Sequence, residues 1–442
     1  MNEKKSQRLN VLLFLLPIFM FFGLSWFAEK GEAVSLREQR TLSAWPAFTL
    51  QSVASGEFAA GIESYFADRF SFRERFIAEG NRLKSLRGLP EDDEVTIVAT
   101  QGNNMHQVQS DDPVEAAPAS GPVAESGDGG TSSPTEAEAE PAEEPASALQ
   151  GNYLVVGNRA MIVYYYTPLA AKQYADTLNA FAAKVGDRYG LSTMIVPSSI
   201  EFLENEKYRR LSPPQSVALD YAAEHLSDAV RFVPVRDALE RRMQEYVYFR
   251  TDHHWTALGA YYAYEAFAET VGLEPMPIED YVREDLGEFL GTTYAATLSE
   301  SVGAEPDDLT VYRPNVEYTY KKIVNGKRLD AELIDKEAKG YAAFLGGDSP
   351  LSVIETKQKT GKRLLVFKDS FANAFLPFLT PHYEEIHIID LRHYSGDVYA
   401  YMEKESVTDI AFVNSVDVTS HPGYTRILAE KLDLEVEEPN YR

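Results

Sequence analysis

The chain has 442 residues, 44% hydrophobic and 12% aromatic, which is enough to build a sizeable core. Its formal net charge of −26 argues against a protein that coats nucleic acid, because the phosphates would be repelled. It contains no cysteine, which excludes thiol catalysis, cysteine-bound zinc and disulfides.

The N-terminus predicts a membrane anchor. Residues 10–28 read NVLLFLLPIFMFFGLSWFA, an apolar run close to the roughly 20 residues that a helix needs to cross a bilayer. Lys4, Lys5 and Arg8 precede this run and place residues 1–9 in the cytoplasm. The run is longer than a usual signal-peptide core, and no clear small-x-small cleavage site follows it. We therefore expect a single-pass protein of the cell membrane, with the bulk of the chain outside the cytoplasm. A cleaved signal peptide is the alternative.

Two further segments precede the main alternating pattern. Residues 29–90 carry aromatic residues among charges at near-helical spacing, which predicts a membrane-proximal helical segment. Residues 109–150 contain ten acidic residues and no basic or aromatic one, a composition typical of a disordered loop. Strand-like runs at 94–100 and 152–166 flank this loop. We therefore expect it to interrupt a single domain, residues 91–442, rather than to separate two domains.

Apolar strands alternate with helices from residue 151 onward, which indicates an α/β fold. Such alternation favours a mostly parallel sheet with helices on both faces. The expected helices are 169–190 and 236–245, and the expected strands are 192–197, 230–235, 363–367, 385–391 and 409–414.

The stretch YFRTDHHWTALGAYYAY, residues 248–264, carries the first candidate chemistry. On an extended chain Asp252 and His254 point to the same side, and His253 points to the other. A carboxylate beside an imidazole is the orienting half of a nucleophilic triad. Thr256 is placed to cap the helix that follows. Neighbouring histidines that point apart seldom bind one ion together, so a metal site is the weaker alternative. Core packing and helix capping are a further alternative.

A serine at a strand-to-helix turn is the second candidate. The apolar strand in RLLVFKDSFANAF leads directly into Asp369-Ser370-Phe371, and a helix follows. A serine there lies near backbone N–H groups and a helix dipole, which suits a nucleophile. Ser349, in GGDSP, is a decoy, because Pro350 and a probable strand follow it.

These motifs resemble a known family. YFRTDHHWTALGAYYAY resembles the signature of the DHHW family. FLGGDSPLSVIET and LLVFKDSFANAFLPFLTPHYEEIHIIDLRHY look like its C-terminal motifs, and LREQRTLSAWPAFTLQSVASGEFAAGIESYFADRFSFRERF looks like its membrane-proximal segment. That family is similar to the SGNH-like domains of alginate O-acetylation proteins, which implies an SGNH-hydrolase-like, flavodoxin-like fold. The chain has Lys368 where the acetylation proteins have glycine, and Asp348 where the resemblance to its closer family leads us to expect asparagine.

The resemblance implies a serine acyltransferase or esterase that modifies an exported polysaccharide or cell-envelope glycopolymer. Asp252 and His254 would be the acid and base and Ser370 the nucleophile, with no metal and no cofactor. The acyl donor would be a membrane-embedded acyltransferase. A non-catalytic, membrane-tethered scaffold for polymer assembly is the alternative function.

Five other residues are candidates for the oxyanion hole or for substrate contact. The backbone N–H of Phe371, with that of the nucleophile, is the expected oxyanion donor. Gly347 allows close backbone approach to a substrate. Arg250 either binds a carboxylated sugar or braces the neighbouring aspartate. Arg392 and Asn414 follow or end apolar strands, where the mouth of a site would lie.

Overall fold

The structure is a computed structural model. It describes residues 152–435 except for residue 325, the short strands β1 (Val34–Ser35), β2 (Arg40–Thr41) and β3 (Val95–Ala99), and a few residues between 45 and 65. Within these parts of the chain, no helix is both long and apolar enough to cross a membrane. The predicted membrane segment, the acidic loop and most of the predicted membrane-proximal segment lie outside the described residues.

An eight-stranded sheet forms the centre of the molecule, in the order β11-β10-β12-β14-β13-β15-β6-β7. Its five strands from β14 to β7 are parallel. The other three are antiparallel and extend one edge of the sheet. The parallel strands are β6 (Gly190–Val196), β7 (Val230–Phe232), β13 (Arg363–Lys368), β14 (Glu385–Ile389) and β15 (Asp409–Ser415). The antiparallel strands are β10 (Tyr318–Val324), β11 (Lys327–Ala331) and β12 (Leu351–Thr356).

The parallel strands have a permuted flavodoxin-like order. Counted from β13 through β14 and β15, and then from β6 to β7, they lie in the spatial order 2-1-3-4-5. In this count β13, which leads to Ser370, is the first strand, and β7, which leads toward Asp252 and His254, is the last. Because the chain begins the sheet at the fourth strand of this count, the Asp-His pair precedes the serine in sequence.

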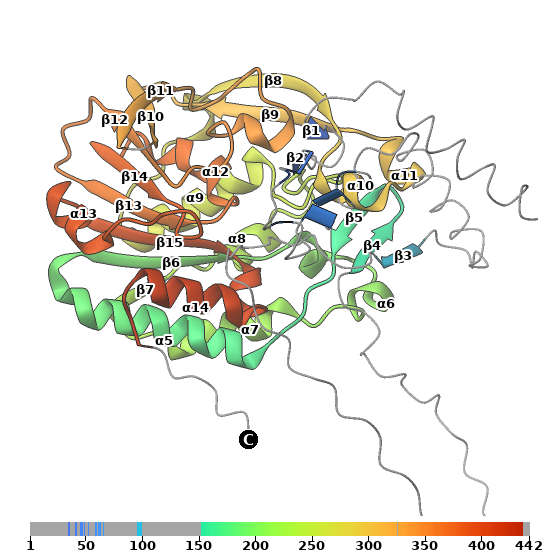
Figure 1. The fold of residues 1–442 in the computed structure, drawn as a ribbon, viewed down its shortest axis with the longest axis horizontal. Helices are drawn as coiled ribbons and strands as arrows, with labels where there is room; N and C mark the ends of the chain where they lie inside the picture. Colours follow the sequence, from blue (N-terminus) through green and yellow to red (C-terminus); the bar gives the residue numbers. More distant parts are fainter. Residues whose placement is uncertain are drawn as a thin grey trace, which may run out of the picture.

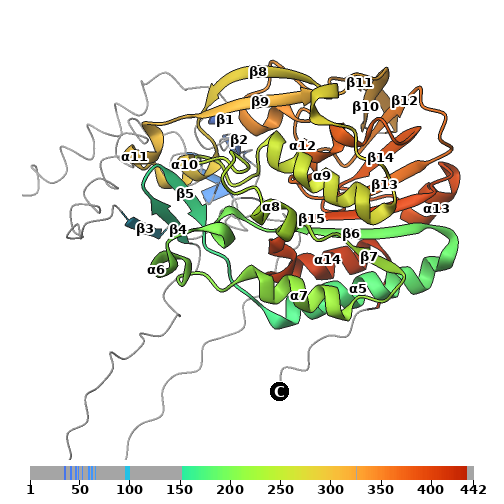
Figure 2. The same cartoon turned by 180° about the vertical axis from the view of Figure 1, so that it is seen from behind.

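Helices cover both faces of the sheet, as the alternation predicted (Figures 1 and 2). Successive strand residues point into two different cores. Leu364 and Val366 pack in one core, while Leu365 and Phe367 pack in the other. The first core includes α8 (Val235–Glu240), α9 (Ala257–Val271) and α12 (Ala372–Phe375). The second includes α5 (Pro168–Val185), α7 (Gln215–His225), α13 (Val398–Lys404) and α14 (Pro422–Lys431).

Local sequence signals fix the ends of the long helices. Pro168 opens α5 at a position where its missing N–H costs nothing, and Gly186 ends it at φ 65°. The helix predicted over 169–190 therefore ends at Val185, five residues earlier than expected, and a short 3-10 helix, Gly186–Arg188, follows it. The Thr256 side chain accepts from the Gly259 N–H and caps α9, as predicted.

A small antiparallel sheet joins the two sides of the acidic loop. β3 pairs with β4 (Asn152–Val156), and β4 pairs with β5 (Arg159–Ile162). The prediction that strands flank the acidic loop is confirmed. The Ala160 N–H of β5 donates to the Arg250 carbonyl oxygen, so this sheet contacts the stretch before Asp252.

The chain between β7 and β13 contains elements that the sequence reading left undescribed. β8 (Val282–Phe289) pairs antiparallel with β9 (Asp307–Arg313). Two short helices, α10 (Thr292–Thr297) and α11 (Glu300–Gly303), connect them and contact β5 (Figure 1). A further short helix, α6 (Glu206–Arg209), follows β6. The β8–β9 region supplies Thr292, which bonds Asp252, and Asp307, which bonds the neighbouring Thr251.

Candidate active site

Ser370 occupies the turn at the carboxyl end of β13, immediately before α12. The carboxylate of Asp369 shapes this turn by accepting from the Phe371 N–H at 3.0 Å and from the Ser415 N–H at 2.6 Å. The second contact ties the end of β13 to the end of β15. Burial raises the pKa of Asp369, although these backbone N–H groups oppose the change. The half-buried serine is held at the edge where open α/β sheets collect their reacting groups.

Asp252 and His254 lie in a tight turn rather than on an extended strand. The turn is closed by a bridge between Tyr248 and Trp255, and the Asp252 carboxylate accepts from the His254 N–H at 3.0 Å. The expectation that His253 points away from His254 is wrong. The centroids of the two rings are 3.7 Å apart, because the stretch between Tyr248 and Trp255 is a turn and not an extended strand.

The three residues form one hydrogen-bonded series. His254 Nδ1 lies 2.6 Å from Asp252 Oδ1, and His254 Nε2 lies 2.8 Å from Ser370 Oγ. A carboxylate only accepts, so Nδ1 carries the proton and Nε2 is left to accept from the serine hydroxyl. The side chains of Asp252 and His254 are 1% and 6% exposed. The structure thus brings together the three residues that the two sequence motifs singled out.

The second oxygen of Asp252 is held by α10. Asp252 Oδ2 accepts from the Thr292 N–H at 2.9 Å and from the Thr292 hydroxyl at 3.0 Å. The same hydroxyl oxygen lies 2.6 Å from His253 Nδ1. Burial by itself would raise the pKa of Asp252, but His254, His253 and the Thr292 N–H together hold it well below its ordinary value. Asp252 is therefore ionised and fixed at both oxygens.

Asp307, at the start of β9, accepts hydrogen bonds from the turn that carries Asp252. This fully buried carboxylate accepts from the Thr251 N–H at 2.7 Å, the Thr251 hydroxyl at 2.6 Å and the Arg250 N–H at 2.9 Å. The Thr251 hydroxyl oxygen in turn accepts from the Gly291 N–H at 2.9 Å. Thr292 and Asp307 are functional candidates that the sequence reading missed. They lie 40 and 55 residues after Asp252, and no local motif marks them.

Aromatic side chains enclose the remaining sides of the series. The ring of Tyr341 stacks on His254 with centroids 3.7 Å apart and planes 2° apart. The Trp255 Nε1–H donates to the Phe371 carbonyl oxygen at 2.9 Å, and the Tyr341 hydroxyl donates to the same oxygen at 3.0 Å. These contacts join the turn that carries His254 to the turn that carries Ser370.

Four of the five additional candidates have their polar groups engaged within the fold. The N–H of Phe371 donates to Asp369, so the expectation that it serves an oxyanion does not fit this geometry. Gly347, at φ 80°, donates its N–H to the Phe344 carbonyl oxygen. The guanidinium of Arg250 contacts Glu305, Pro306 and Asp307 rather than Asp252, and the amide of Asn414 contacts Tyr174 and Tyr424. The Ser370 N–H has no acceptor among the residues that the structure describes.

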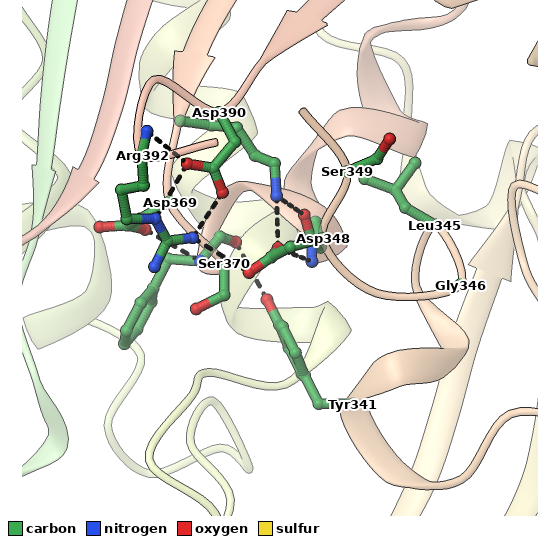
Figure 3. A network of polar contacts seen from close by, with 12 residues as sticks. Tyr341, Leu345, Gly346, Asp348, Ser349, Asp369, Ser370, Asp390 and Arg392 are labelled. Atoms are coloured by element: carbon green, nitrogen blue, oxygen red, sulfur yellow. Dashed lines mark hydrogen bonds and ion pairs between the residues drawn. The ribbon is translucent and has the colours of Figure 1, made fainter. Parts of the chain in front are cut away.

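The fifth candidate, Arg392, belongs to a charge network behind Ser370 (Figure 3). Its guanidinium pairs with Asp390 at 2.5 Å and Asp348 at 3.0 Å. Lys368, almost fully buried, pairs with Asp348 at 2.5 Å and donates to Asn373 Oδ1 at 2.7 Å. Lys368 and Asp348, the two positions at which the resemblance led us to expect other residues, are therefore ion-pair partners. The aspartate compensates the buried charge of the lysine.

Ser349 is held outside this series. Its hydroxyl donates to the Leu351 carbonyl oxygen at 3.2 Å, in the turn that leads into β12. Figure 3 shows it on the opposite side of Asp348 from Ser370. The structure therefore pairs His254 with the serine that the sequence reading preferred.

Asp252, His253 and His254 also form a group whose ligand atoms lie within 4.8 Å of one another, as a metal site requires. Atoms that share one zinc ion at about 2.0–2.2 Å in tetrahedral geometry lie more than about 3 Å apart. Asp252 Oδ1 and His254 Nδ1 are 2.6 Å apart, which is a hydrogen-bond distance. A hydrogen bond between these two atoms therefore fits the geometry better than coordination of one metal ion by both.

The fold and these contacts define an α/β protein with an Asp-His-Ser series at the carboxyl edge of its parallel strands. The chain belongs to the DHHW protein family, whose profile matches residues 129–389, a range that contains all three residues. This confirms the resemblance drawn from the motifs.

Solved structures support the same placement. The crystal structure of a DHHW family protein from Eubacterium siraeum is 30% identical, with a TM-score of 0.59, and covers 64% of this chain and 96% of its own. PatB1 from Bacillus cereus is 22% identical, with a TM-score of 0.50, and covers 60% and 96%, a likeness that shows the fold alone. The O-acetyltransferase domain of Pseudomonas putida AlgJ is 16% identical, covers 64% and 97%, and has a TM-score of 0.36, too low to carry weight. No match was found among the curated proteins.

Proposed function

We propose that this DHHW family protein is a serine acyltransferase or esterase with Ser370 as nucleophile, His254 as base and Asp252 as orienting acid. The observation that carries the proposal is the 2.8 Å contact between His254 Nε2 and Ser370 Oγ, with His254 Nδ1 fixed on a buried carboxylate. His254 takes the hydroxyl proton as the serine oxygen attacks an acyl carbon, and Asp252 stabilises the resulting imidazolium. As the bond from the acyl carbon to the donor's leaving group breaks, His254 gives its proton to that group, which leaves an acyl-serine. A sugar hydroxyl or water then gives its proton to His254 and attacks the acyl carbon, and the proton returns to Ser370 Oγ as the ester bond to the serine breaks.

The proposed acceptor is an exported polysaccharide or cell-envelope glycopolymer, with acetyl as the acyl group. The resemblance of the motifs to those of alginate O-acetylation proteins supports this choice. The proposed setting is the outer side of the cell membrane, with residues 10–28 as anchor and a membrane-embedded acyltransferase as donor. Mass spectrometry of membrane-extracted protein tests the anchor: residues 1–30 should remain on the mature chain, and a new N-terminus near residue 30 would refute it.

The serine is tested directly with an activated acetyl ester. Purified protein should hydrolyse it slowly, and Ser370→Ala should remove that activity while leaving the fold intact. Ser349→Ala is the matched control, because it deletes the other serine that follows an aspartate and should leave the rate nearly unchanged. A sulfonyl fluoride should modify the peptide that contains Ser370. Ester hydrolysis that survives Ser370→Ala would refute Ser370 as the nucleophile, and a cellular function retained in Ser370→Ala would favour the alternative of a non-catalytic scaffold.

The two histidines separate this mechanism from a metal-dependent one. His254→Ala should cost far more activity than His253→Ala, because only His254 contacts Ser370. Treatment with a chelator should leave ester hydrolysis unchanged. Equal losses in the two variants, together with inhibition by the chelator, would favour a metal site at Asp252-His253-His254.

A further inference from the structure

The imidazole of His254 is covered on both faces. Tyr341 lies parallel to it at 3.7 Å, and His253 lies on it at 3.7 Å with the planes 37° apart. Its two nitrogens contact Asp252 and Ser370 at the ring edge. Because the Tyr341 ring is parallel to the imidazole, this contact fixes the ring plane of His254, from whose edge both hydrogen bonds are made.

Tyr341 also reaches the turn of the nucleophile. Its hydroxyl donates to the Phe371 carbonyl oxygen at 3.0 Å and accepts from the Ala374 N–H at 3.4 Å. Burial raises the pKa of Tyr341 well above its ordinary value, so the hydroxyl stays neutral and available as a donor. One side chain therefore contacts the base through its ring and the residue after the nucleophile through its hydroxyl.

The backbone that presents Tyr341 is closely packed. Tyr341 lies in a short 3-10 helix, Gly340–Ala343, between β11 and β12. Gly340 has a φ of 58°, and a Cβ there would lie 2.7 Å from the ring of Phe289. A glycine at this position allows the chain to turn against Phe289, which itself packs on Phe249. Tyr341 is thus presented by a fixed turn.

We propose that Tyr341 is a positioning residue for the acyl-transfer site, holding the ring plane of His254 and, through Phe371, the turn that carries Ser370. This inference rests on the proposed function. Displacement of a reacting group by about 1 Å can lower the rate about a hundredfold. A fixed orientation of the His254 ring should therefore increase the rate measurably. The face of an aromatic ring also stabilises a cation stacked on it, here the imidazolium formed when Ser370 gives up its proton.

Three variants separate this role from ordinary core packing. Tyr341→Leu removes the ring and the hydroxyl, and Tyr341→Phe removes the hydroxyl alone. Phe344→Leu is the matched control, because Phe344 is a buried ring that packs on Tyr341 with centroids 5.2 Å apart. We expect Tyr341→Leu to lower kcat/KM for an activated acetyl ester about 30-fold or more, mostly through kcat, and Tyr341→Phe about threefold. Phe344→Leu should destabilise the fold comparably with little effect on kcat.

The kinetic constants and the NMR signals of the ring give readouts that a packing role alone would not move. In Tyr341→Leu the loss should fall on kcat with KM nearly unchanged, and the NMR signals of the His254 ring protons should broaden, because the ring is no longer held in one plane. In Phe344→Leu the His254 ring signals should stay as in the wild type. Loss of activity no greater than in Phe344→Leu, with unchanged His254 ring signals, would overturn the proposal. The NMR signals remain readable if Ser370→Ala shows that the proposed function is wrong.

Discussion

Asp252 shows how much of the site depends on the atoms of one side chain. Oδ1 accepts from the His254 ring and the His254 N–H, and Oδ2 accepts from the Thr292 N–H and hydroxyl. Each carboxylate oxygen therefore faces hydrogen-bond donors. A side chain at position 252 that itself donated a hydrogen bond would face another donor. The carboxylate selects the tautomer of His254 and is itself kept ionised by the same contacts.

Asp252→Asn should therefore cost more than its similar shape suggests. An amide has one oxygen, so its NH₂ must face either His254 or Thr292, both of which donate. We expect kcat for an activated ester to fall about 10⁴-fold, because the wrong tautomer of His254 is favoured. Asp285→Asn is the control, since Asp285 also accepts from a threonine hydroxyl but on the exposed strand β8. A loss of only a few-fold, with the fold intact, would contradict the assigned role of Asp252.

At the scale of elements, the approach of α10 to the 250–254 turn decides where Asp252 lies. Gly291 immediately precedes α10, and a Cβ there would lie 2.4 Å from Asp252 Cβ and 2.6 Å from Oδ2. The Gly291 N–H is also bonded to Thr251. A side chain at this position would displace either the helix or the aspartate, because both contacts are too short for any real Cβ.

Gly291→Ala should reduce activity more than stability. We expect kcat/KM to fall about a hundredfold as Asp252 moves, and the free energy of unfolding to fall by about 1–3 kcal/mol. Gly423→Ala in α14 is the matched control, because nothing lies within 4 Å of its Cβ position and no positive φ is involved. It should be neutral or stabilise by up to about 1 kcal/mol. Unchanged activity in Gly291→Ala would show that the site tolerates this shift.

At the scale of the whole molecule, the central sheet also contains a buried histidine that is not part of the Asp252-His254-Ser370 series. His387, on β14, is fully buried and contacts the Tyr401 hydroxyl through Nδ1, while its Nε2 lies 3.2 Å from Glu385. Burial lowers its pKa to about 4, below the ordinary histidine value of about 6.5. The folded protein therefore holds His387 neutral in a range where the unfolded chain binds a proton.

This difference makes stability depend on pH. As the pH falls below about 6.5 the unfolded chain gains a proton that the folded chain does not, so stability is lost until about pH 4. The loss from this residue should approach about 3 kcal/mol. Chemical denaturation at pH 7.5, 6 and 5 should show a shallower decline in His387→Gln than in the wild type. His421→Gln, at an exposed position, is the control, and equal slopes in all three proteins would refute the assignment.

The sequence by itself determined the α/β class, the helices on both faces and the three residues of the Asp-His-Ser series. These are local signals: apolar alternation marks strands, a proline and a glycine delimit α5, and two short motifs stand at strand ends. Membership of the DHHW family was likewise predicted from contiguous motifs. Expectations for the membrane anchor and the acidic loop concern residues outside the described parts and stay predictions.

Only the tertiary structure decided what surrounds that series. Thr292, Asp307 and Tyr341 come from the long connection between β7 and β13. No motif there predicts that they contact Asp252, Thr251 and His254, respectively. The orientation of His253 was predicted wrongly, because a period of two applies only to an extended chain and the 250–254 stretch is a turn. The Phe371 N–H was likewise assigned to an oxyanion without knowledge that Asp369 bonds it. Spacing along the chain predicts which side chains of one helix or strand point to the same side. Hydrogen-bond partners, however, are determined by the packing of elements that lie far apart in sequence.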